Sequence, residues 1–109
     1  MKLETILENV HLVPCFQDNF NKDVSTVYIG DLLSFVMANG IENAMWITVQ
    51  RHINVIAVAQ LNDFSCIVFV EGVEPDEQTI QKALELHIPL FMSQENAYAL
   101  ASLLHDIGL

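Results

Sequence analysis

The fold follows from residues 66–92, CIVFVEGVEPDEQTIQKALELHIPLFM, which have the pattern of a strand, a helix and a second strand. The run Cys66–Val70 is continuously apolar, as expected of a strand that is covered on both faces. Pro75 fits the first position of a helix, with Asp76 and Glu77 in its positively polarised first turn. This helix is expected to bury one stripe of side chains: Ile80, Ala83, Leu84 and His87.

The same alternation of helices and strands extends over the rest of the chain. Strands are predicted at His11–Val13, Thr26–Ile29, Met45–Val49 and Ile88–Met92. Helices are predicted at Leu3–Val10, Leu32–Ala38, Ile53–Ala59 and before Gly108, the last with Ala97, Leu100, Ala101 and Leu104 on one face. The expected caps are Asp31 for the second helix, Asn54 for the third, and Ser93 or Asn96 for the last. Alternation of this kind implies right-handed crossovers, so we expect one layered α/β domain with a largely parallel sheet flanked by helices.

Length and composition favour a single core that is partly covered by another subunit. The 109 residues fit one domain over residues 1–109, and a hydrophobic content of 52% with 17% charged residues excludes intrinsic disorder. A mean hydropathy of +0.37 is high for so small a domain. We therefore expect a homodimer with an apolar interface.

The charge balance excludes two classes of partner. Fourteen acidic residues against four basic ones give a formal net charge of −10, which repels nucleic acids and anionic membranes. No apolar run is long enough to span a membrane, and residues 1–8 carry acidic residues where a signal peptide needs apolar ones. Cys15 and Cys66 form no short-spaced pair, so we expect a reduced cytoplasmic protein.

The motifs of the common enzyme classes are missing. No glycine belongs to a phosphate-binding GxxxxGKS/T loop, which phosphoryl transfer would need. His11 and Cys15 are four residues apart, but Pro14 interrupts any helix that would align them for a metal. Cys66 lies in an apolar strand, where burial makes a thiol unreactive. We therefore predict no catalytic residue, no metal, no cofactor and no enzymatic activity.

One polar cluster lies where ligands usually bind in parallel sheets, outside the carboxyl ends of the strands. The candidate ligand-binding residues are Asp31, Thr48, Gln50, Arg51, His52 and Asn54. Arg51 is the only arginine, and it would anchor an anionic group such as a nucleotide or another anionic metabolite. The same residues have a structural interpretation, in which Asn54 caps a helix, His52 is hydrogen-bonded in a loop and Arg51 pairs with a carboxylate. The turns at Gly30–Asp31, Glu71–Gly72 and Ser93–Gln94 should emerge on the same edge.

Three stretches also resemble a known family. Residues 28–39 (YIGDLLSFVMAN), 46–59 (WITVQRHINVIAVA) and 71–90 (EGVEPDEQTIQKALELHIPL) are similar to DRTGG-domain proteins, so that the resemblance covers most of the chain. The last third is also similar to the N-terminal domain of HPr kinase/phosphorylase, whose kinase chemistry belongs to a separate P-loop domain. The eponymous Asp-Arg-Thr-Gly-Gly motif would fall at residues 21–27, where this chain has neither glycine. A close approach of a ligand or a second backbone that depends on those glycines is therefore lost.

The resemblance implies a regulatory or scaffolding α/β domain, found alone or beside modules such as CBS pairs, often dimeric and without a known reaction of its own. Together with the missing motifs, it leads us to expect a non-enzymatic regulatory or adaptor domain that acts through homodimerisation and association with a protein partner. The alternative is a small-molecule sensor that binds a nucleotide or another anion at the cluster Gln50–Asn54.

Overall fold

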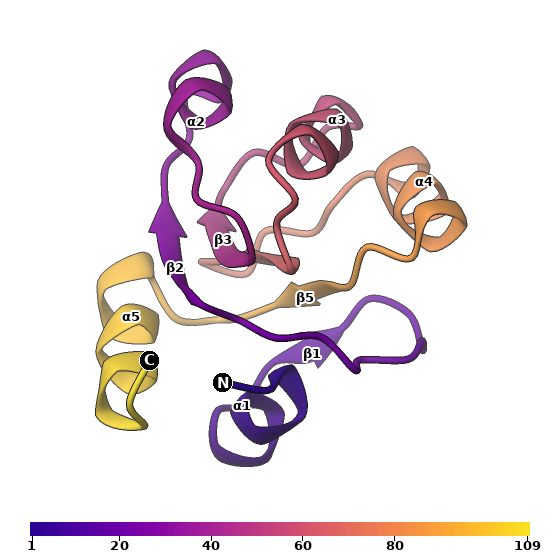
Figure 1. Cartoon of the computed structure of the whole chain (residues 1–109). Coiled ribbons are helices and arrows are strands. Elements are labelled where there is room, and N and C mark those ends of the chain that lie inside the picture. The colour runs from indigo at the N-terminus through magenta and orange to yellow at the C-terminus, as the bar shows by residue number, and fades with distance from the viewer.

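The computed structural model describes all residues, 1–109, and contains five helices and five strands (Figure 1). The helices are α1 (Leu3–Asn9), α2 (Leu33–Asn39), α3 (Asn54–Leu61), α4 (Glu77–Leu86) and α5 (Ala97–Asp106). The strands are β1 (Val13–Pro14), β2 (Thr26–Ile29), β3 (Ala44–Thr48), β4 (Cys66–Phe69) and β5 (Leu90–Met92). No helix has the length and apolar character that crossing a membrane requires.

The strands form one sheet in the order β1-β5-β4-β3-β2. Strands β2 to β5 are parallel, and each lies beside its successor in the sequence. Only β1 is antiparallel, on the outer side of β5. The predicted α/β class with a largely parallel sheet is confirmed.

Helices cover both faces of this sheet, with α2, α3 and α4 on one face and α1 and α5 on the other (Figure 1). Alternate side chains of each central strand point to opposite faces. In β3, Trp46 packs with residues of α2, α3 and α4, whereas Met45 and Ile47 pack with Leu3 of α1 and Leu100 of α5. Two cores therefore share one sheet, which accounts for the continuously apolar strands in the sequence.

Two of the predicted helix caps are wrong, and one is confirmed. The N-cap of α2 is Leu32, without a side-chain bond, because the Asp31 carboxylate is bonded to the loop after β3. Asn54 is the first residue of α3 and caps nothing. Of the two alternatives for α5, Asn96 is the cap, and its side-chain oxygen accepts from the backbone N–H of Ala99 at 2.8 Å.

The buried stripe of α4 also differs from the predicted one. Ala83 is buried and Ile80 is half-buried, as expected, but Leu84 is exposed. His87 lies beyond the last turn, in a left-handed conformation with φ 57°, and is exposed. Thr79 is buried instead, because its hydroxyl donates to the Arg51 carbonyl at 2.8 Å and draws that side of the helix toward the sheet. Pro75 precedes α4, and the N-cap is Asp76.

Gly40, which ends α2, packs directly against an aromatic cluster. Phe64 is buried and lies 5.5 Å from Trp46 and 6.3 Å from Tyr28 between ring centroids. A Cβ atom at Gly40 would come within 2.6 Å of Cζ of Phe64. The φ of Gly40 is −59°, so close packing rather than backbone conformation requires glycine here.

We therefore expect Gly40→Ala to lower the free energy of unfolding by about 1–3 kcal/mol, because the buried ring must shift to admit a methyl group. Chemical denaturation would measure the change. The matched control is Ser34→Ala, an exposed position of α2, which should change stability by less than about 0.5 kcal/mol. Equal stability of Gly40→Ala and the wild type would show that the Phe64 packing is loose.

Candidate functional site

The first half of the predicted cluster binds the loop after β2 to the loop after β3. The Asp31 carboxylate accepts from the Thr48 hydroxyl at 2.8 Å and from the Val49 backbone N–H at 2.9 Å. The Gln50 side-chain amide donates to the Asp31 carbonyl at 2.8 Å, and its backbone N–H donates to the Thr48 hydroxyl at 3.1 Å. Thr48 is buried, so Asp31 satisfies a hydroxyl that has little access to water.

The second half binds the loop after β3 to the start of α4, through Asp76. One carboxylate oxygen of Asp76 lies 3.6 Å from Nε of Arg51, and the other lies 2.6 Å from Nδ1 of His52. The backbone N–H of Asp76 donates to the Arg51 carbonyl at 3.1 Å, and that carbonyl also accepts from the Thr79 hydroxyl. Asp76 was not among the predicted site residues, although its acidic side chain at a helix start was the signal that could have identified it.

Asn54 is not brought to the other residues by a side-chain bond. It lies on the exposed side of α3, where a shallow groove of about 280 Å³ separates α3 from α4. The groove is lined by Ile53, Asn54, Ile56, Ala57, Gln60, Lys82 and Leu86. Five of the six predicted residues thus share one network of loops, and the sixth belongs to a separate surface.

The charges in this network are matched within the protein. Asp76 compensates Arg51, and Asp31 is held by a hydroxyl and a backbone N–H. No buried side-chain nitrogen or oxygen in the structure lacks a hydrogen-bond partner. An anion that binds Arg51 must therefore compete with the carboxylate of Asp76, and the arrangement is well suited to hold three loops together.

A separate crevice lies at the same carboxyl edge, between β4 and β5. The chain leaves β4 toward α4 on one face and leaves β5 toward α5 on the other, and such a divergence commonly opens a ligand crevice. The hollow measures about 190 Å³. It is lined by His11, Val13, Gly72, Glu74, Met92, Ser93 and Gln94.

The floor of this crevice is shaped by a tight turn over Val70–Val73. Glu71 and Gly72 have φ values of 59° and 72°, and the Val73 N–H donates to the Val70 carbonyl at 3.1 Å, as in a type I′ turn. The Gly72 N–H donates to the Ser93 carbonyl at 3.0 Å, which joins the two loops. Sequence reasoning placed both turns on this edge but missed His11, because β1 reaches the edge from the antiparallel direction.

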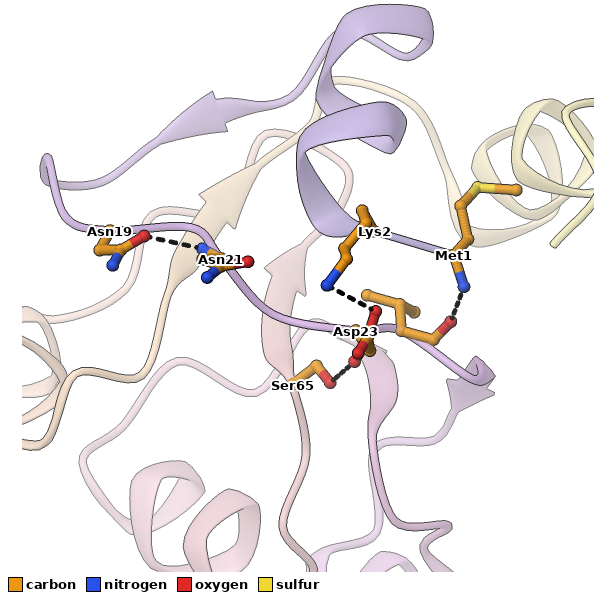
Figure 2. A network of polar contacts seen from close by, with 7 residues as sticks. Met1, Lys2, Asn19, Asn21, Asp23 and Ser65 are labelled. Atoms are coloured by element: carbon orange, nitrogen blue, oxygen red, sulfur yellow. Dashed lines mark hydrogen bonds and ion pairs between the residues drawn. The ribbon is translucent and has the colours of Figure 1, made fainter.

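The largest hollow lies at the opposite, amino edge of the sheet. It measures about 370 Å³, is wide and open, and is lined by Lys22, Asp23, Asn43, Asp63, Phe64 and Ser65. The Ser65 hydroxyl donates to the carbonyl of Asp23 (Figure 2) and to that of Asn43. Polar groups of the wall therefore already bond one another. The crossover helices end at this edge and direct carbonyl groups toward it, which disfavours anions.

Neither thiol readily forms the thiolate that a cysteine nucleophile requires. Burial raises the pKa of Cys15 to about 11, and the negative charge of Glu74 adds to the shift. Burial raises the pKa of Cys66 to about 12, although the positive charge of Lys22 opposes the shift. The structure contains no group of three or more His, Cys, Asp or Glu side chains arranged to hold a metal ion.

No protein-family model matches the chain, and no curated protein matches it. The resemblance to DRTGG domains therefore stays a prediction from the sequence.

The two carboxylates of the network are expected to differ in their effect on folding. Asp31→Ala should lower stability by about 1.5–3 kcal/mol, because it leaves the buried Thr48 hydroxyl and the Val49 N–H without their charged acceptor. Asp76→Ala removes only exposed ion pairs and should cost less than about 1 kcal/mol. Urea denaturation of both variants measures the two losses, and a larger loss for Asp76→Ala would contradict this account.

The thiols should show their raised pKa values directly. At pH 7.5, the folded protein should react with a thiol reagent far more slowly than the denatured chain, because thiolate is the reacting form. In the unfolded chain, a thiol with the ordinary pKa of 9.0 ionises at a lower pH than the two folded thiols do. The neutral thiols therefore contribute to the stability of the folded state below pH 9.0. This contribution is lost as the pH rises toward the folded pKa values of about 11 and 12. A native thiol that reacts at pH 7.5 as fast as the denatured one would disprove this.

Proposed function

We propose that the protein is a non-enzymatic regulatory or adaptor domain of the DRTGG type, which acts as a homodimer and associates with a protein partner. The observation that carries this proposal is an exposed apolar surface along residues 29–41, here called the apolar segment. Its exposed large apolar side chains are Ile29, Leu32, Phe35, Met37 and Ile41. Leu32 and Phe35 are 68% and 59% exposed, which is unusual for adjacent large side chains on one helix start.

The net charge of the molecule favours the apolar segment over the rest of the surface as the place of self-association. Two copies that each carry a formal charge of −10 repel one another over most of their surface. Between Val24 and Ile41, the only charged residue is Asp31, whose carboxylate is already bonded to Thr48 and Val49. Close approach of a second copy is therefore least opposed at the apolar segment.

Two observations speak against an enzyme. The pKa values of both thiols are raised, which leaves no cysteine nucleophile. Arg51 is paired with Asp76, Asp31 is bonded to Thr48 and Val49, and none of these three charged groups lines the crevice between β4 and β5. We accordingly propose that the protein acts by associating with itself and with a partner, and not by catalysing a reaction.

The alternative function is a sensor for a nucleotide or another anion at Gln50–Asn54. One observation favours it: Arg51 and His52 both lie at the carboxyl edge, with exposed side chains. The pairing of both with Asp76 makes it the weaker candidate. Stabilisation of the protein by a nucleotide in a thermal-shift assay, lost in Arg51→Ala, would favour the sensor over the adaptor.

The homodimer is the part of the proposal that can be tested first. Sedimentation equilibrium should show a dimer at micromolar concentration, and Leu32→Asp or Phe35→Asp should weaken it at least tenfold, because each places a charge in an apolar interface. The matched control is Leu84→Asp on α4, which is exposed but lies on a helix away from the apolar segment (Figure 1).

The control should leave the dimer unchanged. A wild-type protein that stays monomeric up to 100 micromolar, roughly a hundredfold above the range in which stable dimers form, would refute the homodimer.

A further inference from the structure

We infer that two copies of the chain join through the outer edge of β2, which pairs antiparallel with β2 of the second copy and makes one continuous sheet. This inference rests on the proposed homodimer and names its interface. It concerns the backbone of Thr26–Ile29, which β3 covers on one side only.

The two edges of the sheet differ in their protection against pairing. The β1 edge is only Val13–Pro14, and a short strand with a proline is a poor template for another strand. The β2 edge is Thr26-Val27-Tyr28-Ile29, which has β-branched and aromatic residues and no charge, proline or glycine. An edge of this composition pairs readily with another strand unless something covers it.

The chain already uses this edge for antiparallel pairing just before β2. Residues 1–3 lie along its outer side (Figure 2). The Val24 N–H donates to the Met1 carbonyl at 2.7 Å, the amino group of Met1 donates to the Val24 carbonyl at 3.0 Å, and the Leu3 N–H donates to the Lys22 carbonyl at 2.8 Å. The outer edge is therefore occupied as far as Val24 and is free from Thr26 onward.

The direction of the backbone groups defines which residues would pair. The Val24 N–H points outward to Met1, whereas the Ser25 N–H points inward to the Asn43 carbonyl at 2.9 Å. Within β2, the pairing of Val27 with Met45 and of Ile29 with Ile47, together with the Gly30 N–H that donates to the Ile47 carbonyl at 3.3 Å, turns Thr26, Tyr28 and Gly30 toward β3. Because successive residues of a strand alternate, Val27 and Ile29 direct their N–H and C=O groups outward. In an antiparallel pair about a two-fold axis at Tyr28, Val27 of one chain exchanges both bonds with Ile29 of the other, and the reverse.

A second copy fits this edge better than a different protein does, because the edge is self-complementary and lacks charge. An interface of standard size covers about 800 Å² per partner. That area is about one seventh of the 5888 Å² surface of one chain, more than a four-residue strand supplies. Side chains beside the edge supply the remaining area: Ile29 on the α5 face, and Leu32 and Phe35 at α2. Ile29 is half exposed, and the other two are more than half exposed.

A proline substitution tests the edge without removing a bond from the monomer. In Ile29→Pro, the outward N–H is lost and the ring blocks a second strand, so the dimer dissociation constant should rise at least tenfold. Ile29→Val keeps the N–H and the strand preference, and its dissociation constant should stay within twofold of the wild-type value. Sedimentation equilibrium of the three full-length proteins gives these constants.

Amide hydrogen exchange of the wild type provides a second readout that does not depend on how the variant folds. The Val27 and Ile29 amides should exchange at least tenfold more slowly at concentrations where the protein is dimeric than where it is monomeric. The Tyr28 amide, which points toward β3, should be protected at both concentrations and is the internal control.

The outcomes separate the interface from the homodimer itself. A dimer that persists in Ile29→Pro, or Val27 and Ile29 amides that exchange equally fast at both concentrations, overturns the β2 pairing but leaves the homodimer intact. A wild-type protein that is monomeric throughout overturns both.

Discussion

Burial of the two central strands on both faces is the constraint on which the rest of the structure depends. All five residues of β3 and all four of β4 are buried. Apolar side chains on both sides of a strand require a layer of helices on each face. The chain supplies three helices for one face through its crossovers, and closes the other face with its first and last helices.

A sheet enclosed in this way leaves little freedom for its loops. The connections after β2, β3 and β4 emerge at one edge, where their polar groups must find partners or remain in water. The loops after β2 and β3 are joined by hydrogen bonds among Asp31, Thr48 and Gln50. The loop after β3 and the start of α4 are joined by the contacts of Arg51 and His52 with Asp76. The same residues that suggest a binding site in the sequence thereby stabilise the loops that carry them.

The faces of the sheet are thus covered and the loops bonded to one another, and the two edges of the sheet differ in how they are protected. One edge is closed by the short β1 with its proline. The other is open, uncharged and flanked by exposed apolar side chains, in a protein with a formal net charge of −10. The proposed self-association rests on this asymmetry between the two edges.

The sequence by itself determined the α/β class, the order of the elements and the parallel arrangement, because continuously apolar strands such as Cys66–Val70 alternate with amphipathic helices. It also gave Asn96 as one of two alternatives for the cap of the last helix, and it placed the polar cluster at the ends of the strands. Only the tertiary structure decided that Asp31 bonds Thr48 rather than its own helix, that Asp76 holds Arg51 and His52, and that His11 lines the crevice beside β5. These contacts join residues 17 to about 80 positions apart, and local patterns carry no information on which loops meet until the strands are paired. The open edge of β2 was also decided only by the tertiary structure, because the place of a strand in the sheet determines whether it is an edge strand.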